Sequence, residues 1–198
     1  MPLPDACTGC SASWSALGFV PPAPPSGRPR LVVWGEAPGD DAVHVGRGFV
    51  GRSGRRLRGI LRGAGLDPGW VEREGYREGE VCYRNVVLCR RPGNSFPDDE
   101  VATDCLRRHQ ADFVAQDDHP WLVAGANAVQ ALLDTPGTPI LRLRGSVLPR
   151  RSGPSWGTAT IHPAFLLHGK EEAEKSQVHL TPLLVQDAAR AVARRSRA

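Results

Sequence analysis

The sequence predicts a three-layer α/β/α fold in which helices cover both faces of a central four-stranded parallel sheet. Four short segments along the chain are predicted to be strands, and the first of them is an unbroken apolar run typical of a buried strand. Helical patterns separate these runs, and strands that alternate with helices are typical of a parallel sheet. The chain has 198 residues, of which 40% are hydrophobic and 23% charged, as expected for one globular domain. We therefore expect a single domain over residues 1–198, without internal repeats.

The N-terminal part begins with an irregular arm and continues into the first strand and helix. Seven prolines fall within residues 1–29, so this arm is expected to lack regular structure. The unbroken apolar run at 31–34 predicts a buried strand, and a glycine-rich loop follows at 35–51. Ser53 can cap the next helix, which has apolar residues on one face and arginines on the other, and Gly65 ends it.

The rest of the chain continues the same alternation. The predicted elements are, in order, a strand at 81–88, a helix at 98–116, a strand at 121–124, a helix at 127–133, a strand at 156–161 and a closing helix at 180–195. Asp98 opens its helix, on which Cys105 shares the inward face with apolar residues. In a parallel sheet, ligands bind beyond the carboxyl ends of the strands. Polar segments follow three of the strands there, at 35–39, 85–94 and 162–167.

The basic residues are almost all arginine. The chain has 25 lysines and arginines against 21 acids, and only Lys170 and Lys175 are lysines. Many of the arginines gather in three groups, at 47–62, 142–151 and 194–197. Guanidinium groups bind phosphate well, so these groups favour a nucleic-acid partner. A solvated surface is the alternative interpretation for any one group.

No part of the sequence predicts a membrane segment. The longest apolar runs are far too short to cross a bilayer. The N-terminus has no charged region followed by an apolar one, as a signal peptide would have. We therefore expect a cytoplasmic protein.

Five cysteines in a cytoplasmic chain do not indicate a disulfide framework. Cys7 and Cys10 form a C-x-x-C pair, and Cys89 and Cys105 follow far downstream. Two close thiolates and two distant ones can hold zinc or an iron–sulfur cluster, and a redox pair is a third possibility. The redox pair is the weakest of the three because no βαβ pattern surrounds Cys7. Cys82 lies among valines and is expected to be a small buried side chain.

Four motifs in register resemble the uracil-DNA glycosylase superfamily, with family 4, the iron–sulfur type, as the best match. The motifs are G-E-A-P-G at 35–39, G-R-G-F-V-G-R-S-G at 46–54, N-V-V-L-C-R-R-P-G-N-S-F-P at 85–97 and H-P-A-F-L-L at 162–167. The resemblance runs from Cys7 to about the closing helix. It implies an enzyme that flips uracil out of DNA and hydrolyses the N-glycosidic bond, leaving an abasic site.

The resemblance also implies a cofactor and a partner. The family's cluster ligands fall on Cys7, Cys10, Cys89 and Cys105, which implies a structural [4Fe-4S] cluster, with zinc as the alternative. The implied partner is uracil-containing DNA, single- or double-stranded. We expect the protein to act as a monomer, associated with the nucleoid through its DNA binding.

The residues that would contact uracil follow from the same motifs. Phe49 is expected to stack on the base, and a core aromatic residue is the alternative interpretation. Asn85 is expected to pair with O4 and N3–H of uracil, unless it is only a turn amide. Ala37 lies in the first loop, whose backbone amides are expected beside the base. His162 is expected to donate near uracil O2 and to stabilise the negative charge that develops there.

The remaining residues would act in catalysis or contact DNA. Glu36 is expected to orient the water or the loop, and Asn94 belongs to the same polar set. Leu166 and Leu167 resemble the apolar wedge that enters the minor groove, with core packing as the alternative. The DNA-contacting arginines implied by the motifs are Arg52 and Arg91.

Three departures from the family pattern bear on activity. Ala42 stands where many members have a glutamate near uracil C5. The nearby residues that could take the place of this glutamate are Asp40, Asp41 and His44. Gly48 replaces a proline before the aromatic residue, which predicts a looser loop. Ala164 replaces a serine in the last motif. Ala42 leaves two alternative functions open: a glycosylase with broader base specificity, and a zinc- or cluster-containing DNA-binding module without catalysis.

Overall fold

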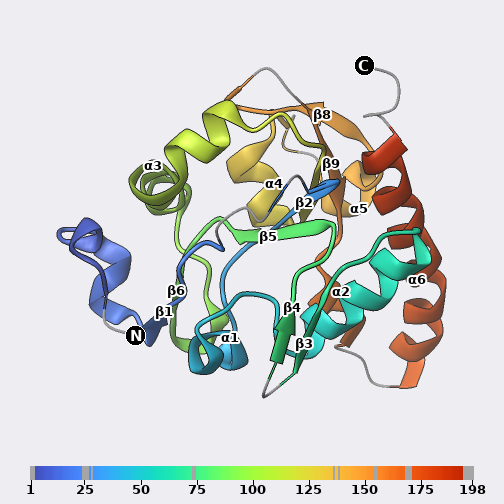
Figure 1. The fold of residues 1–198 in the computed structure, drawn as a ribbon, viewed down its shortest axis with the longest axis horizontal. Helices are drawn as coiled ribbons and strands as arrows, with labels where there is room; N and C mark the ends of the chain where they lie inside the picture. Colours follow the sequence, from blue (N-terminus) through green and yellow to red (C-terminus); the bar gives the residue numbers. More distant parts are fainter. Residues whose placement is uncertain are drawn as a thin grey trace.

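The computed structural model describes residues 3–23, 27, 29–72, 75–135, 137, 139–153, 156–167 and 171–193. Its centre is a five-stranded sheet with the strand order β5-β2-β7-β9-β8 (Figure 1). The strands are β2 (Leu31–Gly35), β5 (Val81–Asn85), β7 (Trp121–Ala124), β8 (Val147–Pro149) and β9 (Trp156–Thr160). The four strands β5, β2, β7 and β9 are parallel, which confirms the predicted sheet. The short edge strand β8 pairs antiparallel with β9 and was outside that prediction.

Helices cover both faces of the sheet, as predicted. The α-helices are α1 (Asp40–Val45), α2 (Arg52–Gly63), α3 (Asp99–Gln116), α4 (Ala126–Leu132), α5 (Ile140–Leu143) and α6 (Glu171–Ala193). Alternate residues of β2 show the layering. Val32 and Trp34 pack with residues of α3 and α4, whereas Leu31 and Val33 pack with residues of α2 and α6. Because both faces are covered, β2 reads as an unbroken apolar run.

The predicted helix boundaries hold best where a capping residue marks them. Asp98 accepts a hydrogen bond from the backbone N–H of Val101 and caps α3, as expected. Helix α2 begins earlier than predicted, since its N-cap is Gly51 and not Ser53. A Cβ atom at Gly51 would lie 2.8 Å from Oδ2 of Asp41, so a larger residue there would require the Asp41 side chain to move. Helix α6 begins nine residues before the predicted start at 180, because its first residues are mostly polar and show no apolar period.

The stretch at 35–51 was predicted to be a loop, but it contains the helix α1. Two aspartates in its first turn favour this helix, since they oppose the positive end of the helix dipole. Gly46 ends it in the left-handed conformation. A second unpredicted element is the hairpin of β3 (Trp70–Glu72) and β4 (Gly75–Arg77).

The described part of the N-terminal arm contains two short 3-10 helices, η1 (Asp5–Cys7) and η2 (Ser11–Ser15), and the strand β1 (Gly18–Phe19). Strand β1 pairs antiparallel with β6 (Cys89–Arg90), while η1 contacts α3 (Figure 1). These two contacts attach the arm to the segment that follows β5. The predicted second strand, 81–88, ends at Asn85 as β5, and β6 lies beyond its predicted end.

Two further observations concern the sequence expectations. Among the described helices, none has the length and apolar character needed to cross a bilayer. The third arginine group, at 194–197, lies outside the described residues.

Candidate active site

A cavity opens at the carboxyl edge of the sheet, where β2, β5 and β9 end. β2 ends at Gly35, β5 ends at Asn85, and His162 follows β9 after one intervening residue. The predicted site residues that line the cavity are Ala37, Phe49, Arg52, Asn85, His162 and Leu167. The topology of the sheet thus brings together residues that are up to 130 positions apart in the sequence.

Phe49 enters the cavity from an unusual backbone conformation. Its φ angle is 60°, in the left-handed region that costs an L-residue about 1–2 kcal/mol. Its ring lies 5.3 Å from the Tyr83 ring, centroid to centroid, at an interplanar angle of 39°. Helix α2 comes so close behind it that a Cβ atom at position 54 would lie 1.8 Å from the Phe49 carbonyl oxygen, so Gly54 is required there.

Asn85 lies beside Phe49 at the end of β5. Asn85 is only 7% exposed. Its backbone carbonyl accepts a 2.8 Å hydrogen bond from Nε2 of Gln110 in α3. A Cβ atom at Gly35 would lie 2.6 Å from Cζ of Phe49 and 2.8 Å from Oδ1 of Asn85. The aromatic ring and the amide therefore meet above Gly35, and they have no room for a side chain there.

The orientation of His162 follows from a local hydrogen bond. The backbone N–H of Ala164 donates to Nδ1 of His162 over 3.2 Å. Because Nδ1 accepts, the proton of the neutral imidazole belongs on Nε2. In that tautomer His162 carries its ring N–H at Nε2.

Glu36 and Asn94, which the motifs place in the catalytic set, do not line the cavity. Oε1 of Glu36 accepts a 3.1 Å hydrogen bond from the backbone N–H of Asn127, in the first turn of α4. Oδ1 of Asn94 accepts from Arg90, whose Nε pairs with Asp40. Of the two roles expected for Glu36, this geometry favours orientation of the loop.

Two carboxylates line the cavity instead. Asp40 and Asp41 belong to the first turn of α1, whereas His44 is exposed and does not line the cavity. Ala42 also lines it and is 4% exposed. The sequence signal for these acids was their position directly after the G-E-A-P-G loop.

The expected wedge divides between two different environments. Leu166 is 4% exposed and packs with Ile60, Ile161 and Leu184, which agrees with the alternative interpretation of core packing. Leu167 lines the cavity as a partly buried residue. The neighbouring Phe165 is 54% exposed, and the sequence analysis did not single it out.

The arginine groups are partly internal, which the sequence did not reveal. Arg58 and Arg150 are 4% and 5% exposed, so neither is available to a phosphate group. Arg150 stacks over the Trp121 ring and donates to the Asp117 carbonyl, and burial lowers the pKa of Arg150 to about 10. Arg52 is exposed at the cavity.

Arg91 is the second arginine implied to contact DNA. Its Nε lies 3.4 Å from Oγ of Ser15 in the arm, and the residue is half-buried outside the cavity lining. Its position is thus tied to the arm rather than to the cavity.

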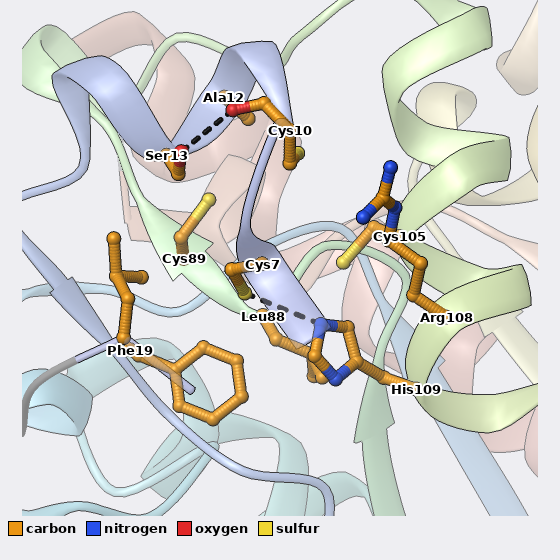
Figure 2. A pocket seen from close by; sticks show the side chains of 11 residues that line it. Cys7, Cys10, Ala12, Ser13, Phe19, Leu88, Cys89, Cys105, Arg108 and His109 are labelled. Carbon is orange, nitrogen blue, oxygen red and sulfur yellow. Dashed lines mark hydrogen bonds between the residues drawn. The ribbon is translucent and has the colours of Figure 1, made fainter. Parts of the chain in front are cut away.

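A second pocket collects the four cysteines that the sequence groups together. Cys7 and Cys10 come from the arm, Cys89 from β6 and Cys105 from α3, and their side chains surround one space (Figure 2). All are buried, and none forms a disulfide. Cys82 packs elsewhere, in the core on the α3 side of the sheet, as predicted.

The protonation of these thiols bears on what the pocket can hold. Burial raises the pKa of Cys105 to about 12 and also raises the pKa of Cys7 and Cys89, and the neighbouring cysteines raise each of them further. Several thiolates at such short range are therefore unfavourable unless a cationic centre lies among them. The donor set, four free cysteines around one apolar pocket, fits a metal centre of the thiolate-bound type.

The spacing of the sulfur atoms can be compared with that around a single zinc ion. Within the described part of the chain, the only three potential ligands whose atoms all lie within 4.8 Å of one another are Asp117, Asp118 and His119. The four cysteine sulfurs are thus spread more widely. Sulfurs around one tetrahedral zinc ion, at about 2.3 Å from it, would lie roughly 3.8 Å apart.

Comparisons with known proteins agree with this geometry. The sequence model described as Uracil DNA glycosylase superfamily matches residues 21–184. The type-4 uracil-DNA glycosylase of Thermotoga maritima is 30% identical over 141 residues, which cover 71% of this chain and 68% of that protein. The enzyme of the same name from Archaeoglobus fulgidus is 28% identical over 177 residues, covering 85% and 82%. The one from Pyrobaculum aerophilum is 38% identical over 76 residues, covering 38% and 34%.

Proposed function

The chain belongs to the uracil-DNA glycosylase superfamily, with type-4 enzymes among its relatives, and we propose that it excises uracil from DNA. The reaction is hydrolysis of the N-glycosidic bond, and it leaves an abasic site. One observation carries this proposal: the cavity at the carboxyl edge of the sheet combines the aromatic ring of Phe49, the amide of Asn85 and the imidazole of His162.

Recognition requires the base outside the helix stack, because a duplex hides the glycosidic bond. In the cavity, the face of Phe49 can stack on the flipped base. The amide of Asn85 can accept from N3–H of uracil and donate to O4. The burial of Asn85 excludes most competing water, which strengthens both hydrogen bonds.

Cleavage leaves negative charge on the departing uracil and positive charge on the sugar. The N–H at Nε2 of His162 can donate to O2 of uracil as this charge develops, and a preorganised donor of this kind lowers the barrier. Backbone amides of the loop at Ala37 can add to it. We assign the orientation of the attacking water to Asp40 or Asp41, which line the cavity, and the positioning of the loop to Glu36.

The DNA surface in this proposal follows the rim of the cavity. Arg52 binds the phosphate backbone there, and Arg91 contributes from the side of the arm. Leu167 and the exposed Phe165 replace the expected pair as the apolar side chains that fill the space left by the base. We propose that the protein acts as a monomer on single- or double-stranded DNA of the cytoplasmic nucleoid.

We propose a [4Fe-4S] cluster in the cysteine pocket, held by Cys7, Cys10, Cys89 and Cys105. Four buried thiols around one pocket support it, and zinc is the alternative centre for the same donor set. The cluster supplies a cross-link among the arm, β6 and α3, and the hydrolysis requires no electron from it. Asn94 lies in the loop that Cys89 anchors, and its bond with Arg90 connects that loop to Asp40.

The test uses a labelled oligonucleotide that contains one uracil, incubated with the protein and then treated with alkali. Strand cleavage at the uracil position supports the proposal. Binding without cleavage would instead identify a non-catalytic DNA-binding module. Cleavage at thymine or at 5-substituted uracils as fast as at uracil would identify a glycosylase with broader specificity.

A further inference from the structure

Arg58 differs from the other arginines of α2 because its side chain is buried. It is 4% exposed, while Arg52, Arg55, Arg56 and Arg62 of the same helix are exposed. Burial disfavours the charged form and lowers the pKa of its guanidinium. A charged side chain in such a place has a cost that its contacts must offset, so those contacts indicate what it does.

Among the described residues, the guanidinium makes a hydrogen bond and a ring contact that both lead to Phe49. Its Nη1 donates to the Phe49 carbonyl oxygen over 2.5 Å. Its Cζ also lies 4.7 Å from the centroid of the Tyr83 ring, in cation–π contact. That ring in turn lies 5.3 Å from the Phe49 ring, and its hydroxyl donates to the Pro68 carbonyl over 2.9 Å.

Phe49 needs support of this kind. Its φ of 60° is unfavourable for a residue with a side chain, and such conformations persist only where the surroundings impose them. The hydrogen bond from Arg58 fixes the direction of the peptide that follows Phe49. The Tyr83 ring limits where the Phe49 ring can lie. Together they set the face that the ring offers to the cavity.

We propose that Arg58, acting with Tyr83, is a positioning residue that holds Phe49 in its left-handed conformation for stacking on the flipped base. Arg58 does not line the cavity and does not touch the base itself. This inference rests on the proposed function, because it assigns a purpose to the orientation of Phe49. It differs from a purely structural role, in which Arg58 would stabilise the fold without affecting binding of the base.

The experiment compares Arg58→Met, which loses the donor, with Arg58→Lys, which keeps one. Arg30→Met is the control, since Arg30 forms an exposed ion pair with Glu80 at the opposite end of β2. Four quantities are measured: the single-turnover rate of uracil excision, the dissociation constant for free uracil by calorimetry, the affinity for uracil-free DNA, and the melting temperature.

We expect Arg58→Met to slow excision and weaken uracil binding, each about tenfold, as for loss of one hydrogen bond to a charged donor. The affinity for uracil-free DNA stays within about twofold, because that contact does not use Phe49. Arg58→Lys recovers part of both losses, and Arg30→Met matches the wild type. Tyr83→Leu removes the supporting ring and produces the same separation of effects, including where Arg58→Met does not fold.

Unchanged uracil binding in folded Arg58→Met and Tyr83→Leu proteins would overturn the inference. Equal losses of uracil binding, DNA affinity and melting temperature would also overturn it, since they would indicate general destabilisation. If the wild type excises no uracil but Arg58→Met still weakens binding of free uracil, the positioning role stands and the proposed function fails.

Discussion

Gly35 lies beneath the two side chains that would hold the base, and its lack of a side chain is a requirement of the site. A methyl group there would overlap both Cζ of Phe49 and Oδ1 of Asn85, at 2.6 and 2.8 Å. We predict that Gly35→Ala lowers the excision rate by on the order of 100-fold, because small misplacements at a reacting centre have large effects on rate. The measurement is the single-turnover rate at saturating enzyme.

Gly59→Ala is the matched control for this prediction. Gly59 is exposed in α2, and a Cβ atom there would have no neighbour within 4 Å. Alanine in a helix interior is more favourable than glycine by about 0.5–1 kcal/mol, so this variant should be slightly more stable and fully active. An active Gly35→Ala protein would show that Phe49 and Asn85 do not contact the base as a unit.

Ala42 concerns which bases the cavity rejects. The residue lines the cavity, while Val43 packs toward Gly18 and His44 is exposed, so neither neighbour replaces a larger side chain there. We predict that Ala42→Glu reduces excision of 5-hydroxymethyluracil relative to uracil, because the added side chain crowds C5. A pocket discriminates a methyl-sized group by only about 1–3 kcal/mol, or roughly 10- to 200-fold.

The ratio of the two single-turnover rates, in the wild type and in the variant, measures this effect. Taking the ratio cancels any general loss of activity from overpacking. A ratio that the substitution leaves unchanged would mean that position 42 does not lie near C5.

At the level of single residues, the sequence indicated the side chains that line the cavity better than the buried side chains that pack around it. Phe49, Asn85 and His162 belong to motifs at strand ends, and the topology of a parallel sheet brings strand ends together. The burial of Arg58 and Arg150 depends instead on which helix or ring packs against each side chain. No local pattern records that packing, so those arginines were grouped with the exposed ones. For the same reason, the sequence did not reveal that Leu166 is buried and that Phe165 is exposed.

Among the elements, the β3–β4 hairpin gives a prediction about pH. Hydrogen bonds from Arg77, and then from the backbone of Gly69, lower the pKa of Asp67 to about 2 from its ordinary value of 3.8. An acid whose pKa is lowered by folding stabilises the folded state fully above its unfolded pKa, and this contribution is lost as the pH falls toward the folded pKa. We predict that Asp67→Asn lowers the melting temperature at pH 6, and that the difference from the wild type shrinks between about pH 4 and pH 2.

Thermal unfolding of the two proteins over that pH range is the measurement. Comparing the difference between them removes effects of acid on other groups, which both proteins share. A difference that stays constant down to pH 2 would show that the Asp67 carboxylate does not stabilise the hairpin through its charge.

The cysteines that join three elements give a second prediction at this scale. Cys105 and Cys82 are 7% and 8% exposed, so they are matched in burial and differ in whether they face the cysteine pocket. We predict that Cys105→Ala removes the visible absorbance and the bound iron, whereas Cys82→Ala keeps both. A colourless wild-type protein with tightly bound zinc would contradict the iron–sulfur assignment.

Helices and strands were easiest to predict where a short stretch of sequence is enough to identify them. Strands β2 and β7 are apolar runs, and α3 has an aspartate cap, so these elements can be recognised from short stretches of sequence. Strand β8 has three residues that are exposed or half-buried, and it exists because β9 offers an edge. Helix α1 was assigned to a loop because six residues are too few to show a helical period.

In the whole molecule, the cavity and the cysteine pocket lie next to the same end of β5. The cavity and the cysteine pocket share the segment that follows β5, since Asn85 ends the strand and Cys89 begins β6 four residues later. The arm pairs with that segment through β1 and contacts α3 through η1. A centre held by the cysteines, as we propose, would stabilise the region that carries the Asn85 amide.

We propose that Phe49, Asn85 and His162 form one site that releases uracil from DNA. The most direct measurement is the single-turnover rate of uracil release from an oligonucleotide, followed by mass spectrometry, for the wild type, Asn85→Ala, His162→Ala and the control Arg30→Met. We predict that the wild type and the control release uracil and leave an intact strand with an abasic site. His162→Ala should be slower by about 100- to 1,000-fold, as for loss of a donor to a developing oxyanion. Bound but unaltered oligonucleotide with the wild type, or unchanged rates in both site variants, would contradict the account.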